Sequence, residues 1–232
     1  MKKILLLAGL VTISNLSLFG QNVSGQSILD QTVAQPRMLH HKVTKEMLAA
    51  YVAPEEAPQG LTTIYSSLGT DPKNLYNYID TWLVSGPNSV VIFSDFIALP
   101  FTPKSNSHIS EVRAAILYYG DGADQVNLSI YKDSKGHPGG LLAGPVTVTN
   151  LPKSFTCCQL AVANFASVPV SAGKQYWVVA NTPKTGKGSD FLGEWAGAVS
   201  PMLMMSGNAE QTGWVTFNGN GLPAGDVLGT VP

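Results

Sequence analysis

From Leu61 onward, short apolar stretches alternate with polar turn residues, and the pattern has no helical periodicity. The clearest stretch is QVNLSIYKD (125–133), in which Val126, Leu128 and Ile130 alternate with Asn, Ser and Tyr. A period of two sends successive side chains to opposite faces of a strand. We therefore predict a strand here with one buried face and one solvated face.

Strand-like stretches of this kind continue along the chain: SVVIFSDFIALPFTP (89–103), HISEVRAAILYYG (108–120), LLAGPVTVTNLP, CQLAVANF, KQYWVVAN (174–181), DFLGEWAG, MLMMSG and GWVTFNGNG. Turn-forming residues separate many of them, at GDGAD, DSKGHPGG, LPKS and TPKTGKGSD. Regularly spaced strands with no helices between them predict an all-β fold, a single antiparallel β-sandwich of jelly-roll type.

The first residues have the pattern of a secretory signal peptide. Lys2 and Lys3 precede an uncharged apolar stretch, and small or polar residues follow it up to the candidate cleavage points Gly20 and Gly25. The apolar run is shorter than the roughly 20 residues that a helix needs to span a bilayer. We assign residues 1–25 to the signal peptide and expect a secreted bacterial protein, extracellular, at the cell surface or in the periplasm, with no membrane span.

Residues 26–60 differ in pattern from the rest and are predicted to form an arm outside the core. LHHKVTKEMLAAY in this segment can form one short helix with Thr44 as its N-cap. Pro54 and Pro58 then stop any helix and indicate an extended linker. The β-sandwich domain is expected to span 61–232.

Composition narrows the range of partners. Only 12% of residues are charged, whereas the chain has 23 glycines and 15 prolines, which is typical of short strands joined by tight turns. The whole chain carries 14 basic and 15 acidic residues, so loss of the leader's two lysines leaves 12 against 15, a net charge of −3. This weak negative field has no basic stripe, and we expect no nucleic-acid partner.

Five segments in order resemble the choice-of-anchor R domains, a family of secreted bacterial β-sandwich proteins. The segments are TWLVSGP (81–87), IALPFTP (97–103), VNLSIYKDSKGHPGGLLA (126–143), SAGKQYWVVA (171–180) and VLGT (227–230). The resemblance covers nearly the whole predicted domain. It implies a surface-associated sandwich, and no enzymatic activity or set of active-site residues comes with the family.

The only two cysteines, Cys157 and Cys158, are adjacent. Adjacent Cα atoms across a trans peptide lie about 3.8 Å apart, closer than an unstrained disulfide prefers, so a bond between them requires a turn or distortion. An oxidising compartment favours such a vicinal disulfide. Reduced residues at a strand edge, a bridge between chains and a metal site are the alternatives.

No motif of an enzyme or a nucleotide-binding site occurs, and the four histidines are assigned to surface and turn positions. Carboxylates that could pair for glycoside hydrolysis lie in or beside predicted strands: Asp95, Glu111, Asp190 and Glu194. Asp121 and Asp124 of GDGAD could bind calcium, although aspartates are also ordinary turn residues. We expect no other cofactor.

The tryptophans offer the best binding signal. Trp177 alternates with Val179 and is predicted to be core, whereas Trp82, Trp195 and Trp214 stand near strand ends. Each of these three can pack inside the sandwich or stack on a sugar ring. The candidate ligand-binding residues are Trp195, Trp214, Asp190, Glu194 and Asn218.

These observations predict a secreted, non-catalytic binding or adhesion module for a glycan or another extracellular surface component, such as a surface protein. The alternative is a structural subunit of a matrix, surface layer or fibre that self-associates through residues 26–60 by adding a strand to a neighbour's sheet. A glycan-active hydrolase is the third interpretation.

Overall fold

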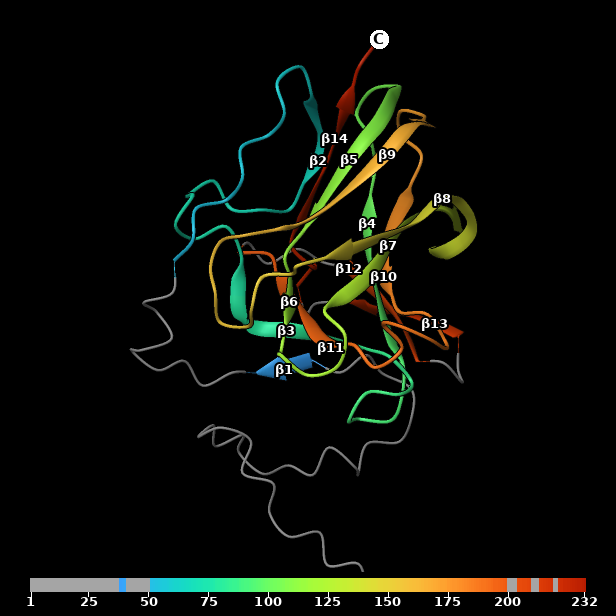
Figure 1. Cartoon of the computed structure of the whole chain (residues 1–232). Coiled ribbons are helices and arrows are strands. Elements are labelled where there is room, and N and C mark those ends of the chain that lie inside the picture. The colour runs from blue at the N-terminus through green and yellow to red at the C-terminus, as the bar shows by residue number, and fades with distance from the viewer. Residues whose placement is uncertain (1–37, 41–50, 200–203, 210–212, 219–220) are drawn as a thin grey trace, which may run out of the picture. The chain divides into compact units, whose positions relative to one another are not determined.

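The computed structural model describes residues 38–40, 51–199, 204–209, 213–218 and 221–232, which all belong to one compact unit (Figure 1). The predicted signal peptide lies outside these residues. The described part contains fourteen strands and no helix. The strands are β1 (Met38–His40), β2 (Thr62–Ser66), β3 (Asn77–Ser85), β4 (Asp95–Phe101), β5 (Ser107–Ala114), β6 (Ile116–Tyr118), β7 (Gln125–Ser134), β8 (His137–Thr149), β9 (Ala161–Val170), β10 (Tyr176–Asn181), β11 (Leu192–Gly197), β12 (Met204–Ala209), β13 (Gly213–Asn218) and β14 (Gly225–Thr230).

Two antiparallel sheets form the β-sandwich, so the predicted fold class is confirmed. The smaller sheet has the order β2-β14-β5-β9, which Figure 1 shows as four neighbouring strands. The larger sheet contains the run β4-β10-β7-β8. In this arrangement the last strand pairs between β2 and β5, and the chain crosses repeatedly from one sheet to the other. Such alternation is the connectivity of a double-sheet jelly roll.

Additional strands extend the larger sheet beyond those four. β6, β11 and β3 continue it on the β4 side, β1 pairs with β3, and the β12–β13 hairpin also pairs with β4. No helix in the described part of the chain is both long enough and apolar enough to cross a membrane.

The core lies between the inward faces of the two sheets. On β4, alternation sends Ile97, Leu99 and Phe101 into the main apolar cluster, whereas Ala98 belongs to a small cluster on the opposite face. The row Val126, Leu128, Ile130 of β7 is fully buried in the same core. Alternating apolar positions therefore give each strand an inward face, as the sequence pattern predicts.

The N-terminal arm contacts the sandwich in its described parts. Met38–His40 form a strand, since their backbone pairs with Trp82, Thr81 and Asp80 of β3. The His40 Nδ1 atom also lies 2.8 Å from Asp80 Oδ1. Residues 41–50, which include the predicted N-cap Thr44, lie outside the described residues. The short helix predicted after Thr44 therefore stays a prediction.

A second contact joins the arm to a buried charge on the smaller sheet. Arg113 and Glu111 form an ion pair in which both side chains are buried. The two terminal nitrogens of Arg113 donate to the backbone carbonyls of Glu55 and Glu56, each at 2.8 Å. A guanidinium cannot lose its charge, so each of its buried N–H groups needs an acceptor. The arm supplies two of them.

Asp226 lies opposite Arg113 on the neighbouring strand β14. Burial raises the pKa of its carboxyl above the ordinary value, while a hydrogen bond from Ser66 and the charge of Arg113 lower it by less. Its Oδ1 atom is buried and has no hydrogen-bond partner among the described residues. The folded protein therefore holds the Asp226 proton more tightly than the unfolded chain does.

Asp226→Asn should stabilise the protein at neutral pH. Because the folded-state pKa of Asp226 is raised, its contribution to stability is complete at low pH and is lost as pH rises through the folded pKa. The variant's advantage in melting temperature should be clear at about pH 7 and should vanish near pH 3, where the wild-type carboxyl is protonated too. Thermal unfolding of both proteins at the two pH values measures the difference. An equal gain in melting temperature at the two pH values would contradict this prediction.

Gly229 of β14 marks the closest approach between the last strand and β5. A Cβ atom placed there would lie 1.9 Å from the carbonyl oxygen of His108 and 2.9 Å from Cδ1 of Ile64. The clash is with backbone, which cannot move aside as a flexible side chain can. The register between β14 and β5 also shifts between Leu228 and Gly229. Only glycine fits this position.

Gly229→Ala should therefore lower the free energy of unfolding by at least about 2 kcal/mol. Gly140→Ala in β8 is the matched control, because a Cβ there meets nothing within 4 Å, and it should change stability by less than about 0.5 kcal/mol. Chemical denaturation of both variants measures the difference. Equal stability of the two variants would show that β14 can shift to accept the methyl group.

Candidate functional site

The structure does not bring the candidate tryptophans to one surface. Trp195 is fully buried beside Trp82, which faces it across the β3–β11 pair, and its Nε1 donates to the Ala224 carbonyl at 2.8 Å. Trp214 is half-buried and packs on the separate cluster of Ala98, Trp177 and Val179. Trp195 is thus a core residue with a satisfied N–H group, and it has no exposed ring face for a sugar.

The polar residues predicted beside them are also dispersed. Glu194 is fully buried, and its Oε2 accepts from Thr81 Oγ1 and from the Tyr119 hydroxyl, each at 2.7 Å. Burial first, and the Glu194 charge second, raise the pKa of Tyr119. Asp190 is half-buried and accepts from the Ala123 amide at 3.1 Å. Asn218 ends β13, and its side chain lies outside the described residues.

The aspartates suggested for calcium belong to a turn. Asp124 Oδ1 accepts from the Leu151 amide at 2.9 Å, and the Tyr118 hydroxyl donates to the Gly122 carbonyl at 2.6 Å. Asp121 lies close enough to Tyr118 for its charge to help raise the pKa of that phenol, after burial and Asp124. In the described part of the chain, no group of three or more His, Cys, Asp or Glu side chains is placed to hold a metal ion.

The cysteine pair is a disulfide inside the core. Cys157 and Cys158 are bonded to each other, both are buried, and the chain turns at Ser154 and Phe155 just before them. The Cys158 amide donates to the Val52 carbonyl at 2.7 Å, which attaches the arm to this loop. The Tyr76 hydroxyl donates to the Thr156 carbonyl at 2.7 Å. The disulfide is therefore a structural junction between the arm and the core.

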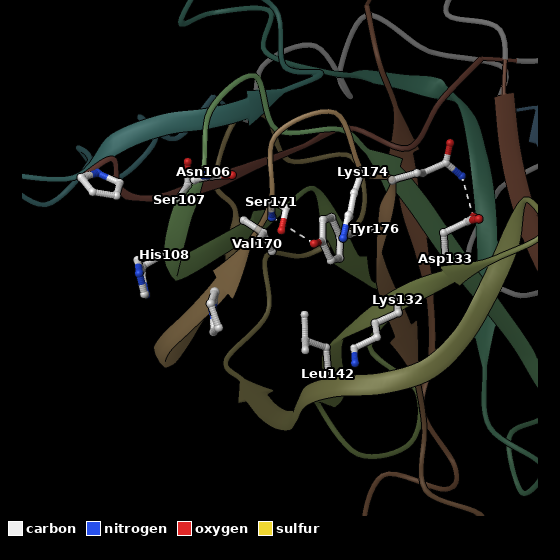
Figure 2. A pocket seen from close by; sticks show the side chains of 13 residues that line it. Asn106, Ser107, His108, Lys132, Asp133, Leu142, Val170, Ser171, Lys174 and Tyr176 are labelled. Atoms are coloured by element: carbon white, nitrogen blue, oxygen red, sulfur yellow. Dashed lines mark hydrogen bonds between the residues drawn. The ribbon is translucent and has the colours of Figure 1, made fainter.

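One concave site stands out instead, a pocket of about 790 Å³ at one end of the sandwich, which we name the end pocket (Figure 2). It lies where β5 and β9 of the smaller sheet face β7, β8 and β10 of the larger one. Its lining residues are Asn106, Ser107, His108, Lys132, Asp133, Leu142, Pro169, Val170, Ser171, Lys174, Gln175, Tyr176 and Pro232. None of the candidate residues named from the sequence lines it.

Strand pairing sets the wall of the end pocket on the larger sheet. Tyr176 of β10 pairs with Phe101 on one side and with Lys132 on the other, so the three side chains share one face. The rings of Phe101 and Tyr176 stack with centroids 5.7 Å apart. The Tyr176 hydroxyl accepts from the Ser171 amide at 3.0 Å, and this bond holds the turn between β9 and β10. The buried core thus ends at Tyr176, and Lys132 begins the polar part.

Hydrogen bonds hold several polar groups of the end pocket in place. Asn106 Oδ1 accepts from the Ala172 amide at 3.0 Å, and His108 Nδ1 lies 3.1 Å from Ser167 Oγ. Asp133 Oδ1 accepts from Gln175 Nε2 at 3.0 Å, the contact dashed in Figure 2, and from Trp177 Nε1 at 2.9 Å. A site with fixed polar groups beside apolar side chains is suited to orienting a small ligand.

The sequence contains one signal for the end pocket, in strand β7. The inward-facing row Val126, Leu128, Ile130 continues, two residues on, at Lys132. A lysine at the end of a buried row marks the point where the sandwich opens to water. The facing residues come from β5, β9 and the turn before β10, and their convergence depends on long-range pairing.

No family model matches the chain, and neither a comparison with curated proteins nor one with solved structures finds a match.

Proposed function

We propose that the protein is a secreted, non-catalytic β-sandwich that binds an extracellular glycan in the end pocket. The observation that carries the proposal is the pocket's combination of an apolar wall with a dense set of hydrogen-bonding groups. Leu142, Val170 and the edge of Tyr176 supply apolar surface, and the turn at Ser171 and its neighbours supplies polar groups. Sugars need both, since they present C–H faces and hydroxyl groups together.

The size of the end pocket agrees with this proposal. A volume of 790 Å³ falls in the range of about 300–1,000 Å³ that small-ligand sites occupy. The pocket accommodates part of a chain better than a buried small molecule because it is open to solvent at the end of the sandwich. Among the described lining residues, the only carboxyl side chain is that of Asp133, whereas hydrolysis by paired acids uses two.

The sequence supplies the cellular context of the proposal. The predicted leader directs the chain out of the cytoplasm, where glycans of the cell envelope and matrix are the abundant polymers. The resemblance to choice-of-anchor R domains implies a surface-associated sandwich with no catalytic residues. Both are expectations from the sequence, and both support the proposal that the end pocket binds a glycan.

Filling the end pocket should weaken binding without unfolding the protein. Ser171→Trp places an indole in the lining and should weaken glycan binding by about tenfold or more, as the loss of several hydrogen bonds predicts. Thr185→Trp, at an exposed position outside the lining, is the matched control and should bind as the wild type does. A glycan array followed by calorimetry on the bound polysaccharide measures both variants.

Equal binding by Ser171→Trp and wild type would place the glycan site elsewhere. An array that finds no bound glycan for the wild-type protein, tested with and without calcium, would overturn the proposed function itself.

A further inference from the structure

Two lysines in the end pocket occupy positions that favour a negatively charged ligand. Lys132 lies at the end of an otherwise apolar inward row, directly opposite Tyr176 across the β7–β10 pair. Lys174 lies in the turn before β10, two residues from Tyr176, where its amide donates to the Ser171 carbonyl at 3.3 Å. Figure 2 shows both side chains on the Tyr176 side of the pocket. Pairing and the turn therefore bring two cations to one wall.

Both lysines lie at exposed positions of the pocket lining. Within the described residues, neither Lys132 nor Lys174 forms an ion pair or a side-chain hydrogen bond, although both line the pocket. Asp133, the single acidic side chain among the described residues that line the pocket, already accepts N–H groups from Gln175, Trp177 and Gly136. Its charge offsets one lysine at most, and its oxygens are occupied by those donors. The lining side chains thus keep a net positive charge.

The hydrogen-bonding capacity left in the pocket is rich in donors. Each lysine has three N–H groups, and the amide nitrogen of Asn106 has two that form no hydrogen bond with another described residue. His108 adds its second ring nitrogen, which donates or accepts according to the tautomer, because the first faces Ser167. Donors at this density match a ligand that presents acceptor oxygens, and charge-assisted bonds to an anionic oxygen are the strongest of this kind.

We infer that the end pocket selects acidic glycans, with Lys132 and Lys174 binding the carboxylate or sulfate group of one sugar. This inference rests on the proposed glycan-binding function and names its ligand class. Leu142 and Val170 contact the C–H surface of the ring, and Asn106 donates to a hydroxyl or ring oxygen. A bare inorganic anion would leave the apolar wall unused, whereas an acidic sugar fills both parts of the end pocket; an acidic peptide is the competing ligand that the test below includes.

The test compares probes that share a backbone and differ in charge. Oligogalacturonate and its methyl ester present the same sugar with and without free carboxylates. Dextran sulfate and dextran present the same sugar with and without sulfate groups. Polyglutamate carries negative charge without any sugar. Calorimetry should find binding to at least one acidic glycan. It should be about tenfold or more tighter than to its neutral counterpart, and weaker as salt rises from about 0.05 to about 0.5 M.

Lys132→Met and Lys174→Met remove the charges and keep the length of the side chains. Each should weaken acidic-glycan binding about tenfold, and the double variant should bind acidic and neutral forms alike. Lys187→Met is the control, because it removes the same charge from an exposed position outside the lining. Circular dichroism and melting temperature confirm that all variants fold.

The outcomes separate this inference from the proposed function. Equal binding of acidic and neutral glycans, unchanged by the lysine variants, would overturn acidic selectivity and leave glycan binding in place. Binding of polyglutamate as tight as that of the acidic glycans would also overturn it, since charge alone would then suffice. Failure of every probe, together with an empty glycan array, would overturn both.

Discussion

The pairing of the last strand between two early ones is the constraint on which this fold depends. β14 lies between β2 and β5, so segments 62–66, 107–114 and 225–230 must meet before the smaller sheet exists. Such non-local pairing costs chain entropy, which burial of the apolar faces between the sheets offsets. The close approach at Gly229 shows how tightly this junction is packed. Without β14, the inward faces of β2 and β5 would lack a shared sheet.

The end pocket follows from how the two sheets finish. Along the middle of the sandwich, both inward faces are apolar and fill the space between the sheets. At the end, the row on β7 changes from Ile130 to Lys132, and the facing strands contribute Ser107 and Val170. A lysine cannot be buried unpaired, so its ammonium must reach water or an anion. The same change that ends the core therefore places a lysine in the lining of the end pocket.

Buried polar groups also tie the N-terminal arm to the sandwich. Arg113 is buried with Glu111, and the remaining donors of its guanidinium bond to carbonyls of residues 55 and 56. The disulfide loop at 157–158 bonds to Val52, and β1 pairs with β3. The described arm is thus fixed through its backbone at three places, by strand pairing, by the loop at 157–158 and by the Arg113 side chain. Side-chain packing contributes little there, since Tyr51 and Val52 are exposed.

The sequence by itself determined the elements that depend on local pattern. The period of two at 125–133 specified a half-buried strand, and the succession of strands and turns specified an all-β sandwich. Adjacency showed that a bond between Cys157 and Cys158 would require a turn or distortion. These follow from geometry within a few residues. The sequence also contained Lys132 in its inward row, although its meaning depends on what faces it.

The tertiary structure alone decided which side chains share a surface. Trp195 and Trp214 have similar sequence surroundings, yet one lies in the main core and the other packs on a separate cluster, because their strands join the larger sheet at different places. Residues 38–40 form a strand because the edge of β3 offers backbone partners. The end pocket combines segments near 107, 132, 170 and 175. Long-range strand pairing brings them together, and no local period encodes which strands will pair.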